Sequence, residues 1–138
     1  TPSYEMTKAV RYFERLGLIK CLVADDSVRM RLSGIDAPER DQPYGKQARK
    51  VLKQYMPLVA KMKEYDEDRY GRLIVELFIE DDKSINAAMI CSGAAWWYDY
   101  YAPDRPQFKQ CQEDAQKNKR GLWAEEEPVA PWDWRRRR

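Results

Sequence analysis

The sequence predicts a small α+β domain in which short strands come first and helices gather in the second half of the chain. We expect residues 1–138 to form one domain around one core, with flexible termini at about 1–8 and 126–138. Five Trp and nine Tyr supply large side chains for that core, so the 35% of charged residues does not indicate a disordered chain. Apolar runs at strand spacing and segments at helical spacing predict the elements in order.

The first predicted element is a β-hairpin. Residues 18–23 are mostly apolar, and residues 28–32 alternate between apolar and arginine side chains. The polar residues 24–27 between them have the length of a hairpin turn. We therefore expect an antiparallel hairpin whose second strand extends to about Ile35.

The middle of the chain predicts a helix followed by two strands. Apolar residues recur at helical spacing from Gly45 to about Met56, and Pro57 ends the helix. A weakly patterned strand is expected at residues 58–66. The continuous apolar run at residues 73–79 predicts a buried strand, closed by the polar turn that follows it.

The C-terminal half predicts two more helices. One runs from about Ile85 to Ser92, with Ser84 as N-cap and Gly93 as its stop. The other spans residues 106–120, and the tail from Pro128 to Arg138 is too rich in Pro and Arg for regular structure. This order of elements suits a five-stranded β-barrel of the OB type with three helices.

The composition excludes several kinds of catalytic site. The chain has no histidine, which rules out Ser-His-Asp and Cys-His catalysis and His-based metal or nuclease sites. Its three cysteines have no zinc-site spacing, and an odd number cannot form a complete disulfide framework. The chemistry must therefore come from carboxylates, Arg, Lys, Tyr, hydroxyls or a hard metal ion.

The net charge does not by itself indicate a nucleic-acid partner. Lys and Arg number 25 and Asp and Glu 23, and without the four arginines of residues 135–138 the count is 21 against 23. An electropositive site must therefore come from a local cluster of basic residues. We expect the basic tail, residues 135–138, to lie outside any packed element and to add a salt-sensitive attraction to phosphates. No stretch approaches 18 apolar residues, so we expect no membrane partner.

Two charged clusters could carry chemistry. In residues 31–40, Asp36 and Glu39 are presented by a loop stiffened by Pro38, and such carboxylates suit a hard cation such as Ca²⁺. The alternative for this cluster is a salt-bridged strand end.

The second cluster is in residues 66–72. There Gly71 allows a tight turn, Arg72 leads into the buried strand, and a base could stack on Tyr70. The alternative there is a solvated charged turn. Together the two clusters suit metal-assisted attack on a phosphodiester.

Five stretches, in this order and spacing, resemble motifs of the staphylococcal nuclease (thermonuclease) family: Arg31-Leu-Ser-Gly-Ile-Asp-Ala-Pro-Glu39, Gly45-Lys-Gln-Ala48, Asp68-Arg-Tyr-Gly-Arg72, Ile85-Asn-Ala-Ala88 and Arg120-Gly-Leu-Trp-Ala124. The ending Pro131-Trp-Asp-Trp-Arg135 looks like the tails of bacterial members, so the resemblance covers residues 17–135. It implies an OB-fold endonuclease, a Ca²⁺-dependent hydrolase of DNA and RNA phosphodiesters that leaves 3′-phosphate ends. We expect a monomer acting on single-stranded DNA or RNA. The compartment is open: the resemblance implies a secreted or periplasmic protein, with the bacterial cytoplasm as the alternative.

The resemblance also assigns residues to roles. It implies catalytic roles for the two phosphate-binding arginines and for the carboxylate that activates water: Arg31, Arg72 and Glu39. It implies a calcium site at the Asp36 carboxylate and the Ala37 carbonyl. It implies contacts to nucleic acid from residues of the turn and of the aromatic segment: Arg69, Tyr70, Tyr98 and Tyr101.

One motif of the family is missing. The family carries Asp-Gly-Asp-Thr after its first strand, with the second Asp as a calcium ligand, and this sequence has no such motif. Either Asp26 of the polar turn takes that place, or residues 15–18 take it without a carboxylate, with Gly17 or a neighbour one residue away at the ligand position. Hairpin length and alternation favour the second alternative, which predicts weak calcium binding.

Two other functions stay open at this point. The first is a non-catalytic member of the same fold that binds single-stranded nucleic acid through Tyr70, the aromatic segment and the basic tail. The second is a protein-interaction module built on Trp96-Trp97-Tyr98, Trp132 and Trp134. Aromatic residues at such spacing more often pack within a domain, and a binding module has no need of Arg31, Glu39 and Arg72 together.

Overall fold

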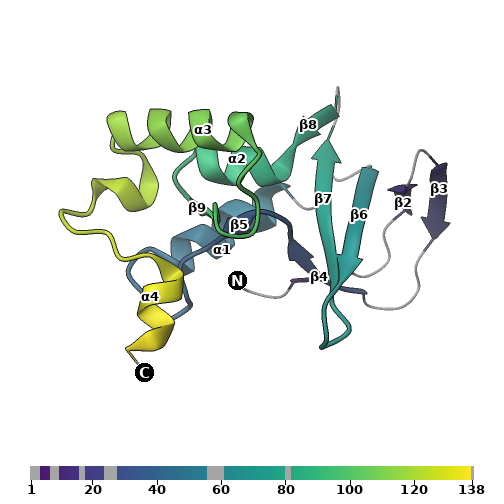
Figure 1. The fold of residues 1–138 in the computed structure, drawn as a ribbon, viewed down its shortest axis with the longest axis horizontal. Coiled ribbons are helices and arrows are strands. Elements are labelled where there is room, and N and C mark those ends of the chain that lie inside the picture. The colour runs from purple at the N-terminus through teal and green to yellow at the C-terminus, as the bar shows by residue number, and fades with distance from the viewer. Residues whose placement is uncertain are drawn as a thin grey trace.

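The computed structural model describes residues 4–6, 10–15, 18–23, 28–55, 61–79 and 82–137. Its strands are β1 (Tyr4–Met6), β2 (Val10–Arg15), β3 (Leu18–Val23), β4 (Val28–Leu32), β5 (Ile35–Asp36), β6 (Lys61–Glu67), β7 (Leu73–Ile79), β8 (Lys83–Ser84) and β9 (Trp96–Trp97). Its helices are α1 (Gly45–Tyr55), α2 (Ile85–Cys91), α3 (Pro106–Lys117), a 3₁₀ helix (Gly121–Ala124) and α4 (Pro131–Arg136). The helices occupy one side of the molecule and the main sheet the other (Figure 1). The α+β class is confirmed.

The main sheet has the strand order β1-β4-β7-β6-β2-β3, with β8 added to β7. Strand β4 runs parallel to β7, and β6 runs antiparallel to β7. The predicted hairpin of residues 18–23 with 28–32 is wrong, because β3 pairs with β2 while β4 has β1 on one side and β7 on the other. With both edges of β4 occupied, no edge is left for β3.

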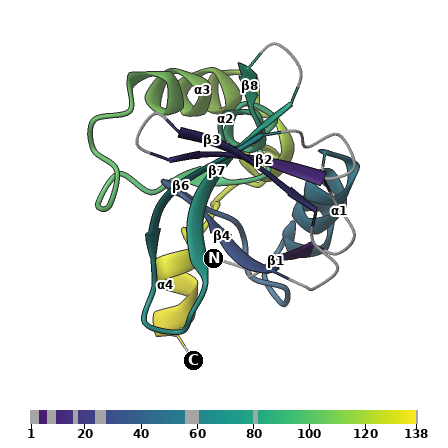
Figure 2. The same cartoon turned by 90° about the vertical axis from the view of Figure 1, so that its right-hand side faces the viewer.

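A closed five-stranded barrel is not confirmed. Among the described residues, β1 and β3 stand at the two ends of the strand order and no ladder joins them. A separate two-stranded sheet pairs β5 with β9, which places Asp36 opposite Trp96. Turned by a quarter, the molecule shows α3, α1 and α4 arranged around the strands (Figure 2).

Most elements from residue 45 onward lie where the sequence predicts them. Strand β7 spans residues 73–79 as expected, and the Ser84 hydroxyl accepts the backbone N–H of Ala87 as the N-cap of α2. Helix α3 is shorter than expected and ends at Lys117. Helix α1 is described to Tyr55, while residues 56–60, which include the start of the strand expected at residues 58–66, lie outside the described part of the chain.

The C-terminal tail differs from the expectation. Residues 131–136 form helix α4, so the prediction of a tail without regular structure is wrong there. Pro131 is buried and stands at the first position of the helix, where its missing N–H costs nothing and its fixed φ suits the helix. The sequence predicts three helices, whereas the described residues form four α-helices.

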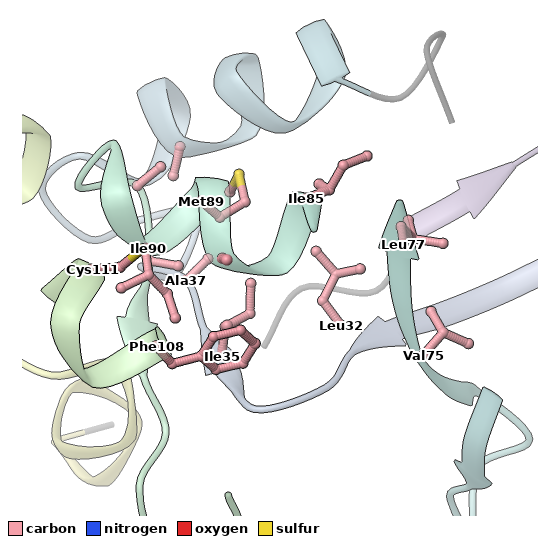
Figure 3. Close-up of a cluster of buried hydrophobic side chains, with 14 of the residues drawn as sticks. Leu32, Ile35, Ala37, Val75, Leu77, Ile85, Met89, Ile90, Phe108 and Cys111 are labelled. Atoms are coloured by element: carbon pink, nitrogen blue, oxygen red, sulfur yellow. The ribbon is translucent and has the colours of Figure 1, made fainter. Parts of the chain in front are cut away.

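The hydrophobic core lies between the sheet and the helices. Side chains from β4, β5, β7, α2 and α3 meet there, among them Leu32, Ile35, Leu77, Met89 and Phe108 (Figure 3). A disulfide between Cys91 and Cys111 links α2 to α3, a pairing the cysteine count did not predict. No described helix is long and apolar enough to cross a membrane.

Candidate functional site

The loop after β5 holds Glu39 by its backbone. The Glu39 N–H donates to Gln42 Oε1 at 2.9 Å, and the Gln42 N–H donates back to the Glu39 carbonyl at 2.9 Å. A side chain on Gly45 would collide with that same carbonyl oxygen, so only glycine allows helix α1 to start so close to the loop. The loop therefore presents Glu39 from a defined backbone position.

Arg135 of α4 joins the two carboxylates of this loop. Its Nη2 donates to Asp36 Oδ2 at 2.7 Å, and its Nη1 donates to Glu39 Oε1 at 2.7 Å and to Asp36 Oδ1 at 3.3 Å. The Asp36 side chain is fully buried, and that of Glu39 is 19% exposed. We call Asp36, Glu39 and Arg135 the Arg135 cluster. Hydrogen bonds from the guanidinium to Asp36 and Glu39 raise the already high pKa of Arg135, so its positive charge is permanent.

Helix α4 is attached to the domain next to this cluster. The Trp132 ring stacks on Tyr98 with centroids 4.7 Å apart and meets Trp96 edge-on at 5.6 Å. The Trp134 indole N–H donates to Asp41 Oδ1 at 3.2 Å, and the buried Gln42 amide donates to the Val129 carbonyl. In Figure 1 the yellow α4 accordingly lies against the blue loop that precedes α1.

Tyr98 lies within electrostatic reach of the Arg135 cluster and of Arg31. Burial and the negative charge of Asp36 raise the Tyr98 pKa, while Arg135 and Arg31 act in the opposite direction. The Tyr98 N–H donates to the Gly34 carbonyl at 2.9 Å, and Tyr101 contacts Tyr98 edge-on at 4.9 Å. The structure therefore brings Asp36 and Glu39 together at Arg135. Tyr98 lies near Asp36, with Arg31 and Tyr101 near Tyr98.

Three more predicted residues, Arg69, Tyr70 and Arg72, lie with Asp68 at the turn between β6 and β7, and we call these four residues the turn cluster. Arg72 Nε donates to Asp68 Oδ2 at 2.6 Å, and the guanidinium carbons of Arg69 and Arg72 lie 4.9 and 5.7 Å from the centre of the Tyr70 ring. Because β4 and β7 run parallel with Arg31 opposite Ile74, Arg72 lies next to the strand that carries Arg31.

Arg135 is a site residue that the sequence did not predict. Residues 135–138 were expected to form a tail outside any packed element, whereas Arg135 binds both loop carboxylates. The signal available was the ending Pro131-Trp-Asp-Trp-Arg135, in which a helix-starting proline and two tryptophans precede the arginine.

Gly17 and Asp26, the two alternatives for the missing carboxylate, lie outside the described residues. The hairpin that favoured Gly17 is not the pairing that the structure shows.

The described residues do not fit a calcium ion in this arrangement. Calcium takes six to eight oxygen ligands in proteins. Both Asp36 oxygens already accept hydrogen bonds from Arg135, as does Glu39. Within the described part of the chain, no three acidic, cysteine or histidine side chains group in a way that could hold a metal. The cation between these carboxylates is a guanidinium.

The aromatic residues of the third candidate function pack within the chain. Trp96 lies 4.4 Å from Trp123 and 5.6 Å from Trp132, centre to centre, and the Trp97 indole N–H donates to the Ala102 carbonyl. They do not form an exposed docking patch. Among the residues whose burial the structure describes, the large exposed aromatics are tyrosines: Tyr65, Tyr70, Tyr100 and Tyr101.

Comparisons with known proteins agree with the resemblance. The family model described as staphylococcal nuclease homologue matches residues 29–125. An "Uncharacterized endonuclease" of Escherichia coli O157:H7 is 36% identical over 121 residues, covering 87% of this chain and 78% of the relative. An "Uncharacterized endonuclease" of Haemophilus influenzae is 36% identical over 121 residues, covering 86% of this chain and 66% of the relative. The "Probable staphylococcal-like nuclease CAN1" of Oryza sativa subsp. japonica is 42% identical over 109 residues, 78% of this chain and 32% of the plant protein. The chain belongs to the staphylococcal nuclease family.

Proposed function

We propose that this chain is a nuclease that hydrolyses phosphodiester bonds of DNA and RNA. One observation carries the proposal. Glu39, whose backbone N–H is bound by Gln42, shares Arg135 with the buried Asp36, and Arg31 lies close enough to Tyr98, next to this group, to oppose the rise in the pKa of that tyrosine. Arg31 has no ion pair with any described residue, so its guanidinium is available to a phosphate. Relatives named endonucleases and nucleases support the same activity.

The proposed mechanism uses Glu39 as the base. Glu39 accepts a proton from a water molecule, whose oxygen forms a bond to phosphorus as the bond from phosphorus to the leaving oxygen breaks. Arg31 and Arg72 neutralise the charge that develops on the phosphoryl oxygens, and the leaving oxygen takes a proton from solvent. Arg69 and Tyr70 contact the phosphate and base of the bound strand, with Tyr98 and Tyr101 as a second aromatic surface.

Calcium dependence and 3′-phosphate products are the finer part of the proposal and rest on the family resemblance. Asp36 and the Ala37 carbonyl are the matching ligands, yet Asp36 is bound by Arg135. The steps above therefore run through protein groups only. A digestion series in Ca²⁺, Mg²⁺ and EDTA, with the product ends analysed by mass spectrometry, tests this part separately.

A catalytically weak member of the family that binds single-stranded nucleic acid is the second candidate. Exposed rings favour it, since Tyr70 is 60% and Tyr101 68% exposed and both could stack on bases. The partner is nucleic acid in both proposals, with the chain acting as a monomer.

Cleavage of single-stranded DNA by the parent and by Glu39→Gln tests the leading proposal. The substitution keeps the shape of the side chain and removes its basicity, so turnover should fall by about 10²–10⁴-fold with binding retained. Glu113→Gln, an exposed glutamate on α3, is the matched control and should cleave like the parent. Equal turnover in Glu39→Gln would remove the proposed role, and binding without cleavage in the parent favours the second candidate.

We also propose a secreted or periplasmic location, which the Cys91–Cys111 disulfide supports because disulfides persist in oxidising compartments. Alkylation of the protein in its native cells, followed by mass spectrometry, should find these two cysteines protected. A reduced pair would favour the bacterial cytoplasm.

A further inference from the structure

We propose that Arg135 is a positioning residue, which holds the Asp36 and Glu39 carboxylates in place and makes helix α4 part of the candidate site. The inference rests on the proposed function, because the position of Glu39 matters for turnover only in a nuclease. Arg135 lies beyond residues 29–125, the part of the chain that matches the family model.

The geometry of the contact suits positioning. One planar guanidinium binds both oxygens of Asp36 and one oxygen of Glu39, with two of the three contacts at 2.7 Å. Charge-assisted hydrogen bonds of this kind fix direction as well as distance, which a lysine ammonium does not do. Since the Glu39 backbone is held by Gln42, a second hold on its carboxylate leaves the side chain little freedom.

The buried Asp36 explains why the guanidinium stays. An ionised carboxylate without solvent contact needs an opposite charge nearby, because burial of an unpaired charge is costly. Asp36 is fully buried, and Arg135, one third exposed, supplies that charge. The guanidinium that binds Glu39 is therefore itself held by the buried Asp36 carboxylate.

Helix α4 delivers Arg135 from a rigid support. On the same short segment, Trp132 stacks on Tyr98, Trp134 binds Asp41 and the Val129 carbonyl accepts from Gln42. Asp41 and Gln42 follow Glu39 in the same loop, and Tyr98 follows β9, the strand that pairs with the strand of Asp36. A helix held in this way fixes Arg135 before substrate arrives, as preorganised sites require.

The first test compares cleavage of a single-stranded oligonucleotide by Arg135→Gln and Arg135→Lys. We expect kcat of Arg135→Gln to fall by up to about 10²-fold, because a Glu39 carboxylate out of position is a poorer base. KM should change little, because the groups that bind the substrate are unchanged. Arg135→Lys should restore part of kcat. Arg49→Gln, which removes an exposed arginine of α1, should behave like the parent. Parental or faster cleavage by Arg135→Gln overturns the proposal, and a faster rate would mean that Arg135 blocks the site.

The second test does not depend on activity. Melting temperatures of Glu39→Gln, Arg135→Gln and the double variant should be non-additive, with the double variant losing less than the sum of the single losses. Additive losses overturn the proposal. If the parent cleaves nothing, the proposed function fails, and this cycle alone decides whether Arg135 holds Glu39. If Arg135→Gln does not fold, Arg135→Lys, which keeps the charge that Asp36 needs, takes its place in both tests.

Discussion

The two arginine–carboxylate groups of this molecule differ in the length of chain between their members. In the turn cluster, Arg72 binds Asp68 four residues away, across the turn between β6 and β7. In the Arg135 cluster, Arg135 binds carboxylates 99 and 96 residues away. The first contact needs only a correctly formed hairpin, whereas the second exists only after β5, the loop that follows it and α4 have come together.

This difference separates the proposed catalytic base from the proposed phosphate contacts. Glu39 depends on tertiary contacts with the C-terminal helix, while Arg69, Tyr70 and Arg72 depend on a turn whose backbone is closed by its own aspartate. Disturbing α4 should therefore affect turnover before it affects binding. Disturbing the turn should affect phosphate contacts while leaving the Arg135 cluster intact.

After Glu39→Gln, the largest effect is expected from Arg31 and Arg72, the arginines that we propose bind phosphate. Arg31→Lys and Arg72→Lys keep the charge and lose the planar fork, so each should lower kcat by about 10²-fold and binding much less. Single-turnover cleavage and oligonucleotide affinity, measured on both variants and on Arg49→Lys, check this. A weakened affinity with turnover intact would favour the binding module over the nuclease.

The next effect is on stability. Asp36→Asn removes the buried carboxylate from the Arg135 cluster and should destabilise the fold by about 3 kcal/mol, the low end for a broken buried ion pair because Arg135 is one third exposed. For a chain of this size the melting temperature should fall by roughly 10 °C. Calorimetric unfolding measures it, with the exposed Asp104→Asn as control. An unchanged melting temperature would mean that the cluster contributes nothing to the fold.

The sequence predicts the parts of this molecule that depend on short-range contacts better than those that depend on long-range contacts. Strand β7, helix α2 with its Ser84 cap and the charged turn before β7 are readable because their signals lie within a few residues. The partner of β3 and the attachment of α4 are set by long-range packing: the hairpin signal of residues 18–32 was outweighed by the pairing of β4 with β7. The sequence could nominate Asp36 and Glu39, but no local pattern connects them to Arg135.

A truncation series separates the contacts of residues 131–135 from the charges of the arginines that follow them. Removal of residues 136–138 leaves Arg135 in place and should not lower the melting temperature. It should reduce the slope of log affinity against log salt by about 0.7 for each phosphate that the removed arginines neutralise in the parent. Removal of residues 131–138 should lower the melting temperature, because it also removes Trp132, Trp134 and Arg135. Equal melting temperatures for the two truncations would contradict the attachment of α4.

The smallest effect is expected from the local pair, and its sign depends on pH. Although desolvation acts to raise the Asp68 pKa, hydrogen bonds from the Arg72 backbone and guanidinium and from the Tyr70 N–H lower it overall. A carboxyl whose pKa is lower in the folded state contributes stability that is fully present above its unfolded pKa of about 3.9 and is lost as the pH falls through the folded value.

Asp68→Asn should therefore lower the melting temperature slightly at neutral pH and not at all in strong acid. Because the pair is local and partly solvated, the loss should be well below that of Asp36→Asn. Melting curves of both variants and the parent from neutral to strongly acidic pH measure the difference. A loss for Asp68→Asn as large as that for Asp36→Asn would show that the turn cluster, despite its short range, holds the sheet together.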